Sequence, residues 1–184
     1  MGLWDWLMGT PDAATAKAGS ARAKALSPSK RTSVFGIQVG DVVTYDLIDH
    51  VVKNKISYDD EGFEWFDYLL QDPASGAEYW LSVEDDDGVS VGIFHEIDLP
   101  VNMPPVPKTL TVEGRTYRQY EHSDARVTVE RAEGKRANQS HIEYWEYKGP
   151  SGHYLTVSRW GGEYEVAVGK SIEEFEVRVL PGNQ

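Results

Sequence analysis

Two stretches of this chain repeat one pattern of aromatic, acidic and aliphatic residues, and this repetition restricts the fold more than any other feature. The first is EWFDYLLQDPASGAEYWLSVEDDDGVSVGIF, residues 64–94, and the second is EYWEYKGPSGHYLTVSRWGGEYEVAV, residues 143–168. Each holds an aromatic–acid–aromatic segment, a turn with Pro, Ser and Gly, a segment ending in Leu-Ser/Thr-Val, a Gly turn and a Val-rich segment. Alternation with a period of two indicates β-strands. We therefore predict an internal duplication of an antiparallel β-meander.

The predicted fold class is all-β, with two duplicated antiparallel meanders of about five strands each. We place the first meander at residues 35–98 and the second at 109–184. Within the first, strands are predicted at 63–71 and 78–85. A Pro-rich connector at 99–108 joins the halves, because proline cannot donate to a β-ladder. The two meanders either close into one barrel or sandwich, or form two packed small barrels.

The residues before the first meander divide into an apolar docking tip, 1–9, and a flexible basic linker, 10–34. The linker has too few large apolar side chains to fold by itself. Two tryptophans in the tip suit an interface with lipid or a protein groove, and the basic linker adds attraction to an anionic membrane. The alternative is a disordered terminus. The predicted docking residues are Leu3, Trp4, Trp6, Leu7 and Met8.

The chain is strongly acidic, with 30 Asp and Glu residues against 18 Lys and Arg residues and a net charge of -12. This charge repels phosphates, so we expect no nucleic-acid partner. It attracts a cationic ligand or a basic peptide, although acidity also serves solubility alone. The chain contains no cysteine, which excludes thiol catalysis and disulfides and favours a reducing compartment. We expect a cytoplasmic protein that contacts the inner membrane peripherally through its tip.

The repeat also assigns residues to faces, because equivalent positions can be compared. Leu81 and Val83 match Leu155 and Val157, and we predict that this face points into the core. The alternate face carries a carboxylate and an aromatic ring in each half, with Asp67 expected across from Trp80 and Glu146 across from Tyr154. Such pairs suit a cation, whereas the alternative is ordinary packing at an interface between the halves. The cation-binding candidates are Trp65, Asp67, Trp80, Glu84, Tyr144, Glu146 and Tyr154.

No catalytic motif occurs in the chain. The acidic run at residues 84–87 lacks the alternating ligands and distal Glu of a calcium loop. The five histidines lack zinc-site spacing. The sequence therefore predicts no catalytic residue, no metal and no cofactor, and it favours a non-enzymatic protein.

The segments VGDVVTYD, FEWFDYLLQD, YWLSVEDDDG and IEYWEYKGPSGHYLTVSRWGG resemble a bacterial domain-of-unknown-function family, number 4178. The resemblance spans about residues 36–181 and includes both halves. It implies no catalytic residue, because none is known for the family. Members are often encoded near phage-shock-protein-A-like and polyamine aminopropyltransferase proteins, which implies a role linked to envelope stress or polyamines.

Two functions follow from the sequence. The first is an adaptor recruited by its tip to the inner membrane or to a membrane-associated partner. The alternative is a binding domain for polyamines or other cationic ligands, through the face that carries acids and aromatic rings.

Overall fold

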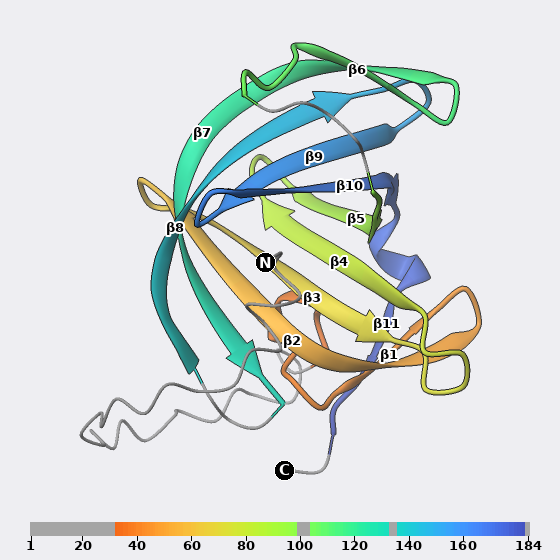
Figure 1. Ribbon diagram of the computed structural model, residues 1–184. Coiled ribbons are helices and arrows are strands. Elements are labelled where there is room, and N and C mark those ends of the chain that lie inside the picture. The colour runs from red at the N-terminus through yellow and green to blue at the C-terminus, as the bar shows by residue number, and fades with distance from the viewer. Residues whose placement is uncertain (1–31, 99–103, 133–135, 183–184) are drawn as a thin grey trace.

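Short turns join the strands into one antiparallel β-barrel (Figure 1). The computed structural model describes residues 32–98, 104–132 and 136–182. The first half opens with a single turn of 3-10 helix, η1 (Val34–Gly36). Its strands are β1 (Val42–Tyr45), β2 (Ile48–Asp60), β3 (Phe63–Gln71), β4 (Glu78–Asp85) and β5 (Val89–Glu96). This confirms the all-β prediction.

Tight turns between these strands use backbone conformations that suit glycine. The turns after β2 and β4 place Gly62 and Gly88 at φ angles of 101° and 137°, where an L side chain is disfavoured. The turn between β1 and β2 is different, because Asp46 and Leu47 hold φ angles of 49° and 64° without a glycine. Leu47 is 98% exposed at the tip of this hairpin.

The second half also has five strands that pair in sequence order and antiparallel. It contains β6 (Thr109–Val112), β7 (Arg115–Arg131), β8 (Arg136–Lys148), β9 (His153–Trp160) and β10 (Glu163–Ile172). After β10, a 3-10 turn, η2 (Glu174–Glu176), leads into β11 (Arg178–Leu180). Strand β11 pairs with β1, so the end of the second half joins the edge of the first.

Eight strands close the barrel in the order β2-β3-β4-β5-β10-β9-β8-β7, and β7 pairs back to β2. The two meanders meet along two seams. At one seam Phe94 of β5 lies opposite Gly169 of β10, and at the other Ile56 of β2 lies opposite Val129 of β7. Both seams are antiparallel, so the structure selects a single barrel from the arrangements that the sequence left open.

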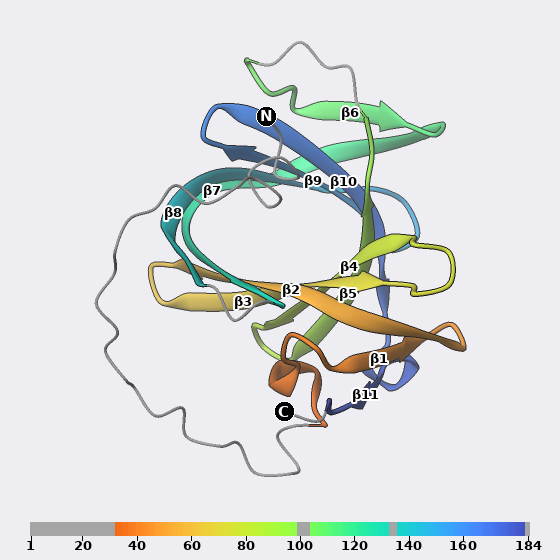
Figure 2. The ribbon, with the colours of Figure 1, turned by 60° about the horizontal axis from the view of Figure 1, so that its bottom comes forward.

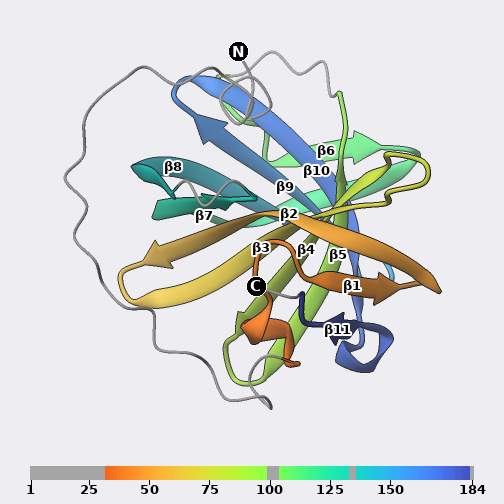
Figure 3. The same ribbon diagram turned by 90° about the horizontal axis from the view of Figure 1, so that it is seen from below.

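The three remaining strands lie outside the ring. Figure 2 shows β6 on one side of the barrel and β1 with β11 on the other, and Figure 3 shows β1 and β11 over the surface formed by β3, β4 and β5. Their apolar side chains cover the outer face. Val43 and Val179 pack with Leu81 and Val83 of β4.

A matching cluster covers the other half, where Leu110 and Val112 of β6 pack with Leu155 and Val157 of β9. The face predicted to point into the core is therefore buried, but outside the ring. This leaves the alternate face, which carries the acids and aromatic rings, to fill the barrel interior. The sequence pattern did not reveal this arrangement, because the cover comes from hairpins that are distant along the chain.

Candidate functional site

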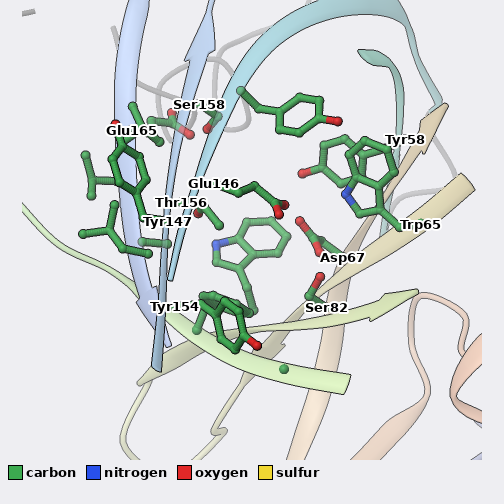
Figure 4. Close-up of a pocket in the computed structure, with 18 of the residues that line it drawn as sticks. Tyr58, Trp65, Asp67, Ser82, Glu146, Tyr147, Tyr154, Thr156, Ser158 and Glu165 are labelled. Carbon is green, nitrogen blue, oxygen red and sulfur yellow. The ribbon is translucent and has the colours of Figure 1, made fainter. Parts of the chain in front are cut away.

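The inward-facing side chains surround a cavity of about 460 Å³ inside the barrel (Figure 4). It is lined by strands of both meanders. All seven residues predicted as cation-binding candidates line this one cavity: Trp65, Asp67, Trp80, Glu84, Tyr144, Glu146 and Tyr154. Positions that the sequence placed on two separate faces thus share one cavity.

The strand register corrects the predicted pairing of Asp67. The repeat predicts Asp67 across from Trp80, but Asp67 lies across from Ser82. The last pair before the turn is Gln71 with Glu78, so the loop is centred one residue later than predicted. Asp67 therefore faces a hydroxyl group.

The same correction applies in the second half. Glu146 lies across from Thr156, and Tyr154 lies across from Lys148. Each half thus sets a carboxylate beside a hydroxyl-bearing residue on the neighbouring strand. A hydroxyl can donate to a carboxylate, and its oxygen can also accept from a ligand.

Asp67 is the more deeply enclosed of the two carboxylates. Burial raises the pKa of Asp67 to about 6, against the opposing effect of hydrogen bonds from the Ser82 and Tyr58 hydroxyl groups. Its Oδ1 atom is buried and accepts no hydrogen bond from the residues that the structure describes. A buried acceptor without a donor is uncommon in folded proteins, and Asp67 is among the residues that line the cavity.

Glu146 lies on β8, separated from β3 in the ring by β2 and β7. Burial raises the pKa of Glu146 to about 7, and the charges of Glu121, Glu84 and Asp67 add to this effect. The Tyr120 hydroxyl donates to Glu146 Oε2 and opposes the rise. Figure 4 shows the carboxyl groups of Asp67 and Glu146 pointing toward one another. Two carboxylates from different meanders thus converge within the cavity.

A bulge in β7 places the tyrosine that contacts Glu146. The pairing of β7 with β8 shifts between Gln119 and Glu121, which leaves Tyr120 as the extra residue. Bulges redirect a side chain in this way and often occur beside binding sites. Tyr120 lines the cavity while its ring stays partly exposed to solvent.

Three further carboxylates line the cavity, from Glu84, Glu96 and Glu165. Burial raises the pKa of Glu84, and the neighbouring charge of Asp86 adds to the rise. The Trp80 indole donates from Nε1 to Glu96 Oε1 over 2.9 Å. The indole is neutral, so it holds the Glu96 carboxylate in place without cancelling its charge.

Lys148 is the one basic residue among the described residues that line the cavity. Its Nζ atom lies 5.9 Å from the centre of the Tyr154 ring, and the side chain is exposed. Five carboxylates against one ammonium group give the interior an excess of negative charge when all are ionised.

Aromatic rings form a fixed wall beside the carboxylates. Tyr58 and Trp65 stack with ring centres 4.8 Å apart and an interplanar angle of 1°. Tyr144 meets Trp65 edge-on at 5.4 Å, and its hydroxyl lies 3.1 Å from both Asp60 Oδ2 and Glu121 Oε1. Contacts at both ends of Tyr144 restrict its rotation, so this wall is preorganised.

Sequence reasoning missed several residues of the cavity, including Tyr58, Glu96, Tyr120, Trp160 and Glu165. The alternation of side chains along a strand was sufficient to identify two of these residues. Glu96 shares the inward side of β5 with Phe94, and Glu165 shares the inward side of β10 with Ala167. Tyr120 gave no such signal, since the bulge breaks the alternation.

The sequence also led to predictions about an N-terminal docking tip and about metal ligands. The predicted docking tip, residues 1–9, lies outside the described residues. Within residues 32–98, 104–132 and 136–182, no helix has the length and apolar character needed to cross a membrane. The same residues contain no group of three or more His, Asp or Glu side chains suited to hold a metal ion.

The fold and cavity define a closed antiparallel β-barrel with an acidic, aromatic interior. The chain belongs to the family described as Domain of unknown function (DUF4178), whose model matches residues 38–174. It is 26% identical over 149 residues to uncharacterized proteins of Mycobacterium bovis and Mycobacterium tuberculosis, covering 77% of this chain and 70% of each relative. No solved structure gives a significant match to the chain.

Proposed function

We propose that the barrel interior binds a small organic cation that carries at least one primary ammonium group, of the polyamine class. The observation that supports this most directly is the composition of the cavity wall. Five carboxylates and several aromatic rings surround about 460 Å³, and one lysine is the sole basic residue among the described lining residues. Cavities of this size typically hold small-molecule ligands.

The facing carboxylates favour an ammonium group that retains its N–H bonds. Asp67 Oδ1 lacks a donor among the described residues, and Glu146 points toward the same space. A primary ammonium supplies three donors, whereas a quaternary ammonium supplies none. A charged donor also strengthens each hydrogen bond to a carboxylate.

The aromatic wall contributes to recognition of the same ligand. A cation over the face of a Trp or Tyr ring is attracted by the ring's π-electrons, and the methylene groups of an alkylamine pack against the same surface. The stack of Tyr58 and Trp65 is held by Tyr144 before any ligand enters. Binding therefore costs little ordering of these rings.

Isothermal titration calorimetry of the full chain at pH 8 tests this proposal. The titrants are cadaverine and spermidine, with tetramethylammonium as a cation that has no N–H donor. We expect both amines to bind in preference to tetramethylammonium. Asp67→Asn and Glu146→Gln should each weaken binding on the order of tenfold, because each removes a charged acceptor.

Glu174→Gln is the matched control. Glu174 is exposed in η2 and does not line the cavity, so its variant removes one negative charge without touching the site. An equal loss of affinity in this control would reveal non-specific attraction to an acidic protein. The absence of heat with either amine at millimolar concentration would overturn the proposal.

A further inference from the structure

A second cavity, of about 400 Å³, lies outside the barrel along the seam between β5 and β10. The β1–β2 hairpin borders it on one side and the β6–β7 hairpin on the other. Its floor comes from outward-facing residues of the seam, where Ile93 pairs with Lys170 and His95 pairs with Val168. We call this cavity the seam groove.

His50 of β2 is the most informative residue of the seam groove. The side chain is 2% exposed, and its ring packs edge-on against Tyr79 with centres 5.9 Å apart. Its Nδ1 atom is buried and has no hydrogen-bond partner among the described residues. A buried imidazole nitrogen without a partner is destabilising, and His50 is among the residues that line the seam groove.

Cationic side chains accompany His50 in the seam groove. Lys170 projects from the floor, and within the part of the chain that the structure describes it forms no ion pair. Arg115 lies on the opposite border, with its Nη1 atom 3.5 Å from Glu113 Oε2. Asp46 is the other acidic residue of the groove, so the groove lacks the large excess of negative charge found in the interior.

Two further histidines, His95 and His153, line the groove. His153 uses Nδ1 to contact the Pro150 carbonyl oxygen at 3.0 Å, so in this tautomer Nδ1 is the donor and Nε2 is left to accept. The side chains of Lys170 and Arg115 can only donate hydrogen bonds, whereas Nδ1 of His50 can be a donor or an acceptor. Lys170 and Arg115 line the same groove as His50, which favours an acceptor as the ligand group.

The remaining walls are flat and partly apolar. Tyr45, Tyr79 and Tyr117 contribute aromatic surface, and Tyr117 is itself buried. We propose that the seam groove binds a small acid in which a carboxylate or phosphate is attached to a flat apolar body. His50 donates to the oxyanion from Nδ1, Lys170 and Arg115 supply positive charge, and the tyrosine rings pack against the body.

The seam groove is separate from the interior site. Phe94 lines both cavities, and its ring lies against two glycines of the barrel wall. A Cβ atom at Gly169 would come within 2.5 Å of the Phe94 ring, and one at Gly92 within 2.6 Å. Phe94 therefore forms part of the wall between the sites, and the proposal for the groove does not depend on the function proposed for the interior.

Titration of the ¹⁵N-labelled full chain with phenyl phosphate, followed by two-dimensional NMR, tests this inference. We expect saturable shifts for the amides of His50, Ile93 and Lys170, without comparable shifts at Asp67 and Glu146. Benzoate distinguishes a carboxylate from a phosphate as the oxyanion. Inorganic phosphate and phenol, each carrying only one of the two recognised features, should bind at least about fivefold more weakly than phenyl phosphate.

Two variants and one control assign the contacts. His50→Phe keeps a ring of similar shape but has no nitrogen, and Lys170→Gln removes the positive charge of an exposed side chain. Each should weaken phenyl phosphate binding about fivefold or more, whereas Lys108→Gln, exposed and away from the groove, should leave it unchanged. Three results would each overturn the inference: shifts confined to the interior residues, no saturation at 10 millimolar (roughly the weakest affinity expected of a built site), or phenol binding as tightly as phenyl phosphate.

Discussion

Asp67→Asn should stabilise the ligand-free protein at neutral and alkaline pH. Burial raises the pKa of Asp67 from its usual 3.8 to about 6. Asparagine has the same shape as the protonated acid, and its carbonyl oxygen accepts from Ser82 and Tyr58 as the carboxyl oxygen does. The substitution therefore removes only the cost of holding a negative charge in the barrel interior.

The size of the effect follows from the difference in pKa. Below pH 3.8 Asp67 is protonated in both the folded and the unfolded state. At such pH values its ionisation therefore makes no difference between the free energies of unfolding of the variant and the wild type. Between pH 3.8 and about 6 the folded state retains a proton that the unfolded state has lost. The free energy of unfolding of the wild type therefore falls by about 1.4 kcal/mol per pH unit. Above pH 6 the free energy of unfolding of the variant exceeds that of the wild type by about 3 kcal/mol.

Glu146 acts in the same direction. The charge of Asp67 contributes to the raised pKa of Glu146, so Asp67→Asn also lowers the cost of ionising Glu146. Because of this coupling, the full gain in the free energy of unfolding of the variant is reached at about pH 8, where both Asp67 and Glu146 of the wild type are ionised.

Urea denaturation of both proteins at pH 4, 6 and 8 measures this gain. Glu174→Gln serves as control, since an exposed charge should change the free energy of unfolding by less than about 0.5 kcal/mol at each pH. Lower stability of Asp67→Asn at pH 8, or a gain that is the same at pH 4 and pH 8, would refute the reasoning. A variant that is more stable and binds amines more weakly would show a binding site maintained at the expense of stability.

Four further predictions concern other parts of the chain. Leu47→Gly should raise the free energy of unfolding by about 1 kcal/mol in urea, because the left-handed φ of Leu47 disfavours a side chain; lower stability would contradict this. Gly169→Ala should cost about 3 kcal/mol and lower the melting temperature, since its Cβ would lie 2.3 Å from the Ile93 carbonyl oxygen; an unchanged melting temperature would show that the seam spreads freely. Tyr120→Phe removes the donor that lowers the pKa of Glu146, so an NMR titration of that carboxyl group should give a value above about 7, and an unaltered titration would argue against the contact. Deletion of residues 1–9 should abolish flotation with anionic liposomes and leave the melting temperature unchanged, whereas continued flotation would exclude the tip as the anchor.

Local patterns were sufficient to predict two strands of the first meander. The predicted ranges 63–71 and 78–85 coincide with β3 and β4, because alternation and turn residues act over a few neighbouring positions. The same alternation grouped Trp65, Asp67 and Trp80 with their counterparts, and these residues line the cavity together with others that the alternation did not single out.

The inside of the barrel could not be predicted from the same pattern. Both faces of β4 are rich in large side chains, with Leu81 and Val83 on one and Trp80 on the other. The choice between them depends on β1, β6 and β11, which cover the outer face from distant parts of the chain. A small error in the position of a turn also affects the whole hairpin. A shift of the turn centre by one residue moves every cross-strand partner by two residues.

The two seams also have a consequence for assembly of the chain. Before they close, one meander exposes the edges of β2 and β5 and the other exposes those of β7 and β10, and unpaired edges readily pair with another molecule. Two chains can satisfy all four edges by exchanging meanders, which produces a domain-swapped dimer with two complete barrels. Refolding at high protein concentration should therefore yield such dimers, and in each of their barrels Asp67 and Glu146 would come from different chains.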